Sequence, residues 1–320
     1  MSKKTAIWLI TAFFLVLIGC MIFGGAMTMF KWDFSKLSTV KYETNTYEIS
    51  DSYKNISIIT DTADIVFAIS NGSEHSVVCH EAKKEKHSVT VIDGALVIKV
   101  NDTRKWYEYI GIAFSTPKIT VYLPKGEYGA LTIKSTTGNI QIPKELSFDS
   151  IDISESTGNV ANYASASDAV KIKTSTGNIT VENISAKKMD LAVTTGKITV
   201  SHAACEDDVK INVSTEKTTI TKTTCKNLVS NGNTGSILLN DVVATGKFSI
   251  KRSTGAVKFE NADASEIFVE TDTGNVSGSL LTDKVFITHT DTGKVDVPKT
   301  VSGGRCEITT DTGDIRIKIQ

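Results

Sequence analysis

Cysteine, proline and histidine are all scarce in this chain of 320 residues, which has five cysteines, four prolines and five histidines. So few cysteines exclude a disulfide scaffold, and so little proline excludes a collagen-like chain. The 35 basic and 36 acidic residues almost cancel, and no basic block occurs. Nucleic acid is therefore not an expected partner, because binding its phosphates needs clustered Lys and Arg.

Motifs for catalysis are lacking as well. The chain has no Gly-x-Ser-x-Gly, no His-Glu-x-x-His and no Gly-rich phosphate loop. Residues 131–320 have no Trp, and their only arginines are Arg252, Arg305 and Arg316. Polysaccharide enzymes built on β-helices need carboxylates on one face and aromatic platforms for sugars. We therefore expect no catalytic residue, no cofactor and no enzyme, and a carbohydrate-active β-helix enzyme is the least favoured alternative.

One long uncharged stretch stands at the N-terminus, over residues 5–30. A bilayer core needs about 20 apolar residues in a helix, so this stretch predicts a transmembrane anchor at residues 1–30. Lys3 and Lys4 precede it, which places the N-terminus in the cytoplasm and the remainder outside. The alternatives are a cleaved signal, whose apolar region is usually shorter, and a lipoprotein processed at Cys20. Residues 31–39 read as a juxtamembrane linker.

The main feature of the sequence is a repeat of Thr-Gly. Nine copies are 19–20 residues apart or twice that, and Thr215-Glu216 stands where a tenth belongs. The nine glycines are Gly138, Gly158, Gly177, Gly196, Gly235, Gly255, Gly274, Gly293 and Gly313. Glycine at this point indicates a tight turn, because it tolerates a positive φ.

Apolar residues alternate on both sides of each turn, as Ile151 and Ile153 do before Gly158. This period of two is typical of strands. A unit of two short strands cannot bury an apolar face alone, whereas stacked units can. We therefore predict an all-β fold: a single-stranded, β-helix-like solenoid of about ten coils over residues 131–320. A meander of hairpins is the alternative.

Residues 40–130 lack the Thr-Gly phase, and we expect them to form an irregular β cap at the membrane-facing end. At the other end the sequence finishes on an alternating strand, residues 315–320. We expect this strand to be the open edge of the last coil, with Arg316 and Lys318 protecting it. End-to-end self-association through that edge is one expected partnership.

Two groups of residues are candidates for special roles. Cys205 and Cys225 follow the turn by nine positions in consecutive coils, so they are a candidate disulfide or two stacked small residues. Trp106, Tyr107, Tyr109 and Phe114 form the one aromatic cluster, which either plugs the solenoid or docks on a partner or on lipid headgroups.

No metal site is expected. Asp272, Asp291 and Asp311 recur in stacked turns, but one carboxylate per turn suits turn stabilisation better than calcium, which takes six to eight oxygens. His202, Cys205 and Cys225 lack an evident fourth ligand for zinc.

The repeated turns, such as Ser175-Thr176-Gly177-Asn178-Ile179, resemble those of a family of exported bacterial β-strand-repeat proteins. The family is provisionally described as adhesins and includes LiaG- and YvlB-like domains of unknown function. The resemblance extends over nearly the whole chain, including Gly24-Gly25 at the end of the anchor and residues 58–67. It implies a membrane-anchored, right-handed β-helix-like ectodomain of the bacterial cell envelope, without catalytic residues to carry over.

These observations favour a non-enzymatic, single-pass cell-surface protein that acts as an adhesin or as an envelope binding or scaffold module. Its expected partners are the membrane, through the N-terminal helix, and an envelope protein or surface ligand. The alternative from another class is an accessory component of envelope-stress sensing, which would work through the anchor and residues 31–130.

Overall fold

The computed structural model describes residues 2–109, 113 and 115–320. It begins with α1 (Lys3–Met29), which Ser2 caps by accepting a hydrogen bond from the Thr5 amide at 3.2 Å. Within the described chain, α1 is the one helix long and apolar enough to cross a membrane. A short 3-10 helix, η1 (Phe34–Leu37), then leads into β structure, and η2 (Trp106–Tyr109) interrupts that structure later.

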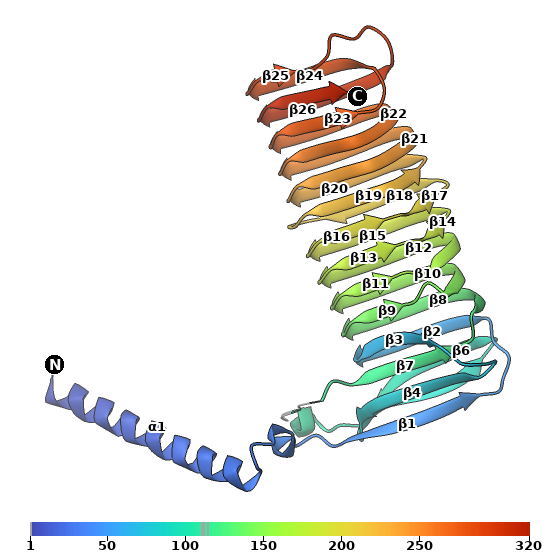
Figure 1. The fold of residues 1–320 in the computed structure, drawn as a ribbon. Helices are drawn as coiled ribbons and strands as arrows, with labels where there is room; N and C mark the ends of the chain where they lie inside the picture. The colour runs from blue at the N-terminus through green and yellow to red at the C-terminus, as the bar shows by residue number, and fades with distance from the viewer. Residues whose placement is uncertain (1, 110–112, 114) are drawn as a thin grey trace.

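The remainder is a single stack of strands that rises away from α1 (Figure 1). The strands of the lower part are β1 (Tyr42–Ile49), β2 (Asn55–Thr62), β3 (Asp64–Ile69), β4 (His75–Ala82), β5 (Glu85–Ile92), β6 (Ala95–Asp102) and β7 (Lys118–Leu123). The middle contains β8 (Gly126–Thr137), β9 (Ile140–Ile142), β10 (Leu146–Thr157), β11 (Val160–Asn162), β12 (Ser165–Thr176), β13 (Ile179–Glu182), β14 (Ser185–Ala186), β15 (Lys188–Thr195), β16 (Ile198–Ser201) and β17 (Ala204–Cys205). The upper part contains β18 (Asp208–Val213), β19 (Thr218–Cys225), β20 (Asn227–Thr234), β21 (Ile237–Thr254), β22 (Val257–Thr273), β23 (Val276–Leu280), β24 (Lys284–Thr292), β25 (Val295–Asp296), β26 (Gly304–Thr312) and β27 (Ile315–Ile319).

Successive coils pair in parallel and in the register of the repeat, which confirms the predicted β-solenoid. Ile153 on β10 pairs with Ile133 below it and Ile172 above it, so like residues stack on like. The inward side chains of every coil form one continuous apolar core that runs from Ile56 to Ile317. Each coil therefore buries the apolar face of its neighbour, which no coil could do alone.

The turn glycines are required by the close approach of neighbouring coils. The backbone φ of Gly177 is 134°, and a Cβ added there would overlap the carbonyl oxygen of Gly158 in the coil below. A Cβ at any of the nine predicted glycines would collide with a carbonyl oxygen of the adjacent coil. For Gly138 this oxygen belongs to Ala63, and for the other eight it belongs to the residue at the glycine position of the adjacent turn. In seven of the nine turns this contact accompanies a backbone hydrogen bond from the Gly amide to the Thr carbonyl of the adjacent coil, as from Gly177 to Thr195 at 2.9 Å.

A ladder of side-chain amides reinforces the turns on one edge. Asn139, Asn159 and Asn178 each follow a turn glycine, and each side-chain carbonyl accepts from the backbone N–H of the next coil at 2.9–3.1 Å. Asp64 begins this ladder by accepting from the Asn139 amide at 2.8 Å. Asn275 and Asp314 repeat the arrangement at the far end of the stack.

Glu216 marks a defect in this stack. The turn pairing of Thr with Thr, present between Thr176 and Thr195, is missing on both sides of Thr215, where the paired residues end at Val213. Toward Gly196, the bond from Ile198 N to Lys217 O is stretched to 3.3 Å, and the usual bond from the Gly amide to the Thr carbonyl of the adjacent coil is not among those that the structure describes. The side chain at the glycine position thus prevents the usual approach to Gly196, whereas Gly235 on the other side still lies close to the Glu216 carbonyl.

The lower end of the stack is closed by an antiparallel insertion. β2 and β3 form a first coil under β8 and β9, with Thr62 paired to Thr137 and Ile65 to Ile140. β4 pairs antiparallel with β1 and β7, while β5 pairs antiparallel with β6. Antiparallel pairing stops the parallel stacking at this end, which faces α1 in Figure 1.

The upper end differs from the prediction. β27 is not the open edge, because it pairs with β23 on one side and β25 on the other. In the same way β26 lies between β22 and β24. The C-terminal coil is therefore inserted between two earlier coils, and the last coil in space is formed by β24 and β25 (Figure 1). Arg316 accordingly does not guard an edge, whereas the pairing with β25 ends there and leaves Lys318 paired only with Ser279 of β23 among the described strands.

Replacing Glu216 by Gly is expected to stabilise the solenoid. Glycine would allow the turn to approach its neighbours and restore the two missing turn pairings, so we expect a gain of about 1 kcal/mol in the free energy of unfolding. Chemical denaturation of the full chain would measure it. The matched control is Gly177→Ala, which should lose at least about 2 kcal/mol because of its positive φ and its clash. Equal stability of all three proteins would contradict this account of the turns.

Candidate functional site

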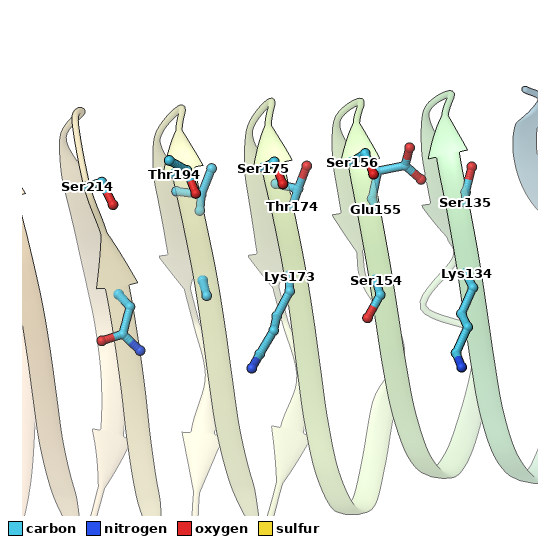
Figure 2. Close-up of a pocket in the computed structure, with 13 residues that line it drawn as sticks. Lys134, Ser135, Ser154, Glu155, Ser156, Lys173, Thr174, Ser175, Thr194 and Ser214 are labelled. Atoms are coloured by element: carbon cyan, nitrogen blue, oxygen red, sulfur yellow. The ribbon is translucent and has the colours of Figure 1, made fainter. Parts of the chain in front are cut away.

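A groove crosses five consecutive coils close to the glycine turns (Figure 2). It encloses about 530 Å³. Most of the lining residues have polar side chains, although much of the exposed wall is apolar. The residues that line the groove are Lys134, Ser135, Ser154, Glu155, Ser156, Lys173, Thr174, Ser175, Ala192, Val193, Thr194, Asn212 and Ser214. Because the coils are in register, these residues fall into rows that run along the solenoid axis.

The outermost row presents two lysines. Lys134 and Lys173 are exposed and flank Ser154 in paired strands, one side chain per coil. Strands are about 4.8 Å apart, so the two lysines are two coils, or about 10 Å, apart. Neither lysine forms an ion pair with any residue that the structure describes. Both ammonium groups are therefore available to a ligand.

The next row toward the turns faces inward and contains an isolated acid. Ser135, Glu155 and Thr174 pair in register, and Glu155 is only 5% exposed. Both of its carboxylate oxygens, and the Ser135 hydroxyl, are buried without a hydrogen-bond partner in the described chain. Elsewhere in this row a threonine donates to the carbonyl of a neighbouring turn, as Thr310 does to Gly274 at 3.1 Å. An ionised carboxylate cannot make that bond.

Burial raises the pKa of Glu155 to about 7. The nearby Ser135 hydroxyl and Thr157 amide favour the ionised form and oppose this effect only in part. The charged residues next to Ser135 and Thr174 on the two flanking strands are Lys134 and Lys173, whose side chains extend away from Glu155 (Figure 2). The carboxyl group thus changes its charge near neutral pH.

Farther along the same inward row lies a buried cation. Arg252 is 4% exposed and donates to the Ser230 hydroxyl at 2.8 Å and to its neighbouring carbonyl, that of Lys251, at 2.9 Å. Its guanidinium occupies the space above Gly232, where a Cβ would clash with it. Desolvation lowers the pKa of Arg252 to about 10. Five coils separate it from Glu155, so the two opposite charges do not pair.

A second buried polar cluster lies in the cap. The carboxylate of Glu81 accepts from the His87 amide at 2.6 Å and lies 2.7 Å from His87 Nδ1, while Asn45 donates to its other oxygen at 2.7 Å. His87 Nε2 lies 2.9 Å from the Thr60 hydroxyl. With Cys79 these side chains could offer three metal-ligating atoms within 4.8 Å of one another. The hydrogen bonds already occupy Glu81 and His87, so the cluster ties the cap to the first coil.

The sequence did not indicate these polar features, with one exception. Glu155 stands in a position where, apart from Arg252, the other copies of the repeat carry uncharged residues such as Ser135, Thr174 and Val193. That contrast could have revealed it. The cap cluster joins four strands of a region without a repeat, so no spacing signals it.

The candidate cysteines lie where the repeat places them. Cys205 and Cys225 occupy one inward column of small residues with Ala186 and Ala244. Both thiols are free and buried. Burial raises the pKa of Cys205 to about 11 and that of Cys225 to about 12, which keeps them protonated. A disulfide between them stays a prediction that thiol counting on the exported protein would test.

The aromatic cluster is largely on the surface where the structure describes it. Trp106 is 79% exposed and Tyr107 is 50% exposed, while Phe114 and the side chain of Tyr109 lie outside the described residues. The aromatic rings that fill the lower core come from other positions. They are Phe67, Tyr128 and Phe148, whose ring centroids lie 5.9–6.4 Å apart.

The residues considered as metal ligands occupy different positions in the coil. Asp272, Asp291 and Asp311 are exposed, and Asp291 lies 2.9 Å from the ring of His289. The hydrogen-bonded turn ladder uses the residue after glycine instead. His202 is a corner residue with φ 51°, in line with Asn183 and other corner residues of positive φ.

The chain belongs to the Toastrack DUF4097 family, which matches residues 53–212, half of the chain. The family is one of unknown function, and its fold is the β-solenoid described above. A search of curated proteins found no match to this chain.

Solved structures are similar to this chain at low sequence identity. A protein from Parabacteroides merdae, provisionally described as an adhesin, is 13% identical with a TM-score of 0.50, over 74% of this chain and 96% of its own. A protein from Parabacteroides distasonis, provisionally described as lipid-binding, is 19% identical with a TM-score of 0.48, over 75% and 97%. Another from that species, provisionally described as an adhesin, is 12% identical with a TM-score of 0.39, over 87% and 98%.

Stability should fall as the pH rises through the pKa of Glu155. Its pKa is raised from 4.5 to about 7, so the folded protein binds the proton more tightly than the unfolded chain. The stabilisation that comes from this tighter proton binding is complete below pH 4.5 and is lost by about pH 8. Its loss lowers the free energy of unfolding by roughly 3 kcal/mol. Denaturation at pH 5 and pH 8 would measure it.

In the Glu155→Gln variant that part of the pH dependence should disappear. Glu270→Gln, which removes an exposed carboxylate paired with Lys251, is the control and should retain it. An unchanged pH profile in Glu155→Gln would show that the buried carboxyl group is not the source.

Proposed function

We propose that this protein is a non-catalytic, membrane-anchored surface module that binds an extended acidic polymer along its solenoid. The observation that supports the proposal most is the groove of Figure 2, in which polar side chains repeat once per coil. A linear polymer with regularly spaced groups can contact such rows over many coils. Multiple weak contacts of this kind add up along one chain.

The charge of the groove favours an acidic ligand. Lys134 and Lys173 project from its outer row without an ion-pair partner in the described structure, whereas the acid in its floor, Glu155, is buried. Serine and threonine hydroxyls between and beside the lysines can both donate and accept hydrogen bonds. The combination suits a polysaccharide that carries carboxylates among its hydroxyls.

The proposed location follows from the N-terminal helix. α1 is long and apolar enough to span a bilayer, and Lys3 and Lys4 at its start favour a cytoplasmic N-terminus. The solenoid would then project outward from the bacterial cell membrane, with the groove starting at β8, directly above the coil of β2 and β3. Adhesin descriptions of the proteins with a similar fold agree with a binding role of this kind.

Binding to polygalacturonate, an acidic polysaccharide, tests the proposal against neutral dextran. The full chain in nanodiscs should bind polygalacturonate more tightly, and the affinity should fall with added salt. Replacing both Lys134 and Lys173 by Ala should weaken binding at least about fivefold, because two cation contacts are lost.

The matched control is Lys251→Ala. Lys251 stands in the same row two coils beyond Asn212, the last groove residue of that row, and Glu270 neutralises it at 2.6 Å. Its loss should leave the affinity unchanged. Equal binding of dextran and polygalacturonate, or no effect of the double replacement, would contradict an acidic ligand in this groove.

A further inference from the structure

The distal coil of the solenoid presents an unpaired edge. β24 pairs only with β26, and β25 only with β27, among the strands that the structure describes. Apart from the Lys284 carbonyl, which accepts from the Thr300 hydroxyl, the other side of each strand has no strand partner among the described residues and is a template for another strand. In Figure 1 this edge lies at the end of the stack opposite to α1.

The side chains of this edge are apolar where those of the coil beneath are charged. Val285 pairs in register with Arg305, and Ile287 with Glu307. Val285 and Ile287 are 37% and 48% exposed. Residues 285–288 contain no charged residue, although exposed edge strands usually carry charge that prevents pairing.

Exposed apolar side chains concentrate near this coil. Beyond residue 34, ten large apolar side chains are described as exposed, and half of them lie between residues 281 and 301. These five are Leu281, Val285, Ile287, Val295 and Val301. The core itself is also open here, because Phe286 and Val297 pack against it while only partly buried. Such a concentration on one end indicates an interaction surface.

The distal coil is also held firmly in place. Lys284 pairs with Gly304 on β26, and its ammonium reaches past that strand to Asp263 on β22, with 2.7 Å between Nζ and Oδ1. Thr282 contacts both charged groups. Lys284 is 2% exposed, so this ion pair is buried. A buried ion pair of this kind costs several kcal/mol to break, which opposes fraying of β24.

We propose that this edge pairs with the same edge of a second copy of the chain, so that two molecules meet tip to tip. The surface that fits an open coil is another coil of the same cross-section, because that is what every inner coil packs against. The proximal end cannot supply it, since the antiparallel cap closes that end. The ends that can meet are therefore the distal ends of two molecules. A two-fold axis between them places β24 of one molecule antiparallel to β24 of the other.

Tip-to-tip pairing would join two membranes, because each copy carries its α1 at the far end of the rod (Figure 1). This consequence rests on the proposed anchoring. The strand pairing itself does not, so the two claims can fail separately.

The test uses the full chain inserted into nanodiscs at one copy per disc. Mass photometry should show pairs of discs, and micrographs should show them separated by two rod lengths. In detergent micelles, which need no membrane orientation, the same chain should form dimers. Pairing in detergent but not between discs would contradict the proposed anchoring and support the strand pairing. Monomers in both media would overturn the inference.

Two variants locate the contact. Ile287→Lys lies beside Glu307, and Val285→Glu lies beside Arg305, so each new charge has an opposite charge in register and neither should disturb the fold. Each should weaken the dimer at least about 100-fold, because two like charges would face each other across the two-fold axis.

Ile59→Glu is the matched control. Ile59 is 38% exposed on an inner coil, between Lys99 and Lys134, and its replacement should leave the dimer intact. Thermal unfolding of all variants checks that each is folded. A dimer that resists both β24 replacements, or one that Ile59→Glu dissociates equally, would place the contact elsewhere and overturn the inference.

Discussion

The whole structure depends on the contact between the backbone of one glycine turn and that of the next. At Gly177 the turn approaches the Gly158 carbonyl so closely that no Cβ fits between them. In seven of the nine turns this approach brings the Gly amide into hydrogen-bond distance of the adjacent Thr carbonyl. It also realigns successive coils at the turn, so that coils of 19 and 20 residues stay in register and the extra residue is absorbed elsewhere, as between Phe148 and Ser150. Register along the strands follows from that constraint.

Because register is fixed at the turns, every position of the repeat becomes a column of stacked side chains. The environment of a residue is then set by the side chains above and below it in its column, rather than by its neighbours in the sequence. Asparagine after the glycine extends a ladder of amides, as Asn139 and Asn159 do. An acid in an inward column, such as Glu155, finds a hydroxyl below and another above but no cation, which is why its pKa rises. The same stacking aligns the exposed lysines of the groove along one line.

The sequence predicted the solenoid and its turns because the glycine phase is both strict and tied to a physical need. It did not predict the order of the last coils. The units around Gly274, Gly293 and Gly313 carry the same Thr-Gly turn and the same alternation, so each is compatible with either neighbour. Features outside the repeat accompany their order, such as Gly304, where a Cβ would overlap the Ser265 carbonyl of β22, and the ion pair of Lys284 with Asp263. A repeat pattern contains no information of that kind.

The repeat pattern did not predict the candidate site either, for a related reason. The groove joins Lys134 to Ser214 across five coils, and its polarity arises from residues that each look ordinary within their own unit. The exposed Trp106 was visible as an aromatic residue, but the sequence did not distinguish a surface position from a core position in a region without periodicity. Repeats therefore define the scaffold, and departures from the repeat define what is individual to this chain.

The central claim, a stack held in register whose C-terminal coil is inserted, is tested most directly by disulfide trapping. In a cysteine-free background, cysteines at Glu270 and Thr309 should cross-link rapidly, because these positions are paired in adjacent strands. Cysteines at Glu270 and His289 should not, because Thr309 lies between them. The reverse result, with Glu270 cross-linking to His289 and not to Thr309, would show that the coils stack in the order of the sequence and would contradict the account.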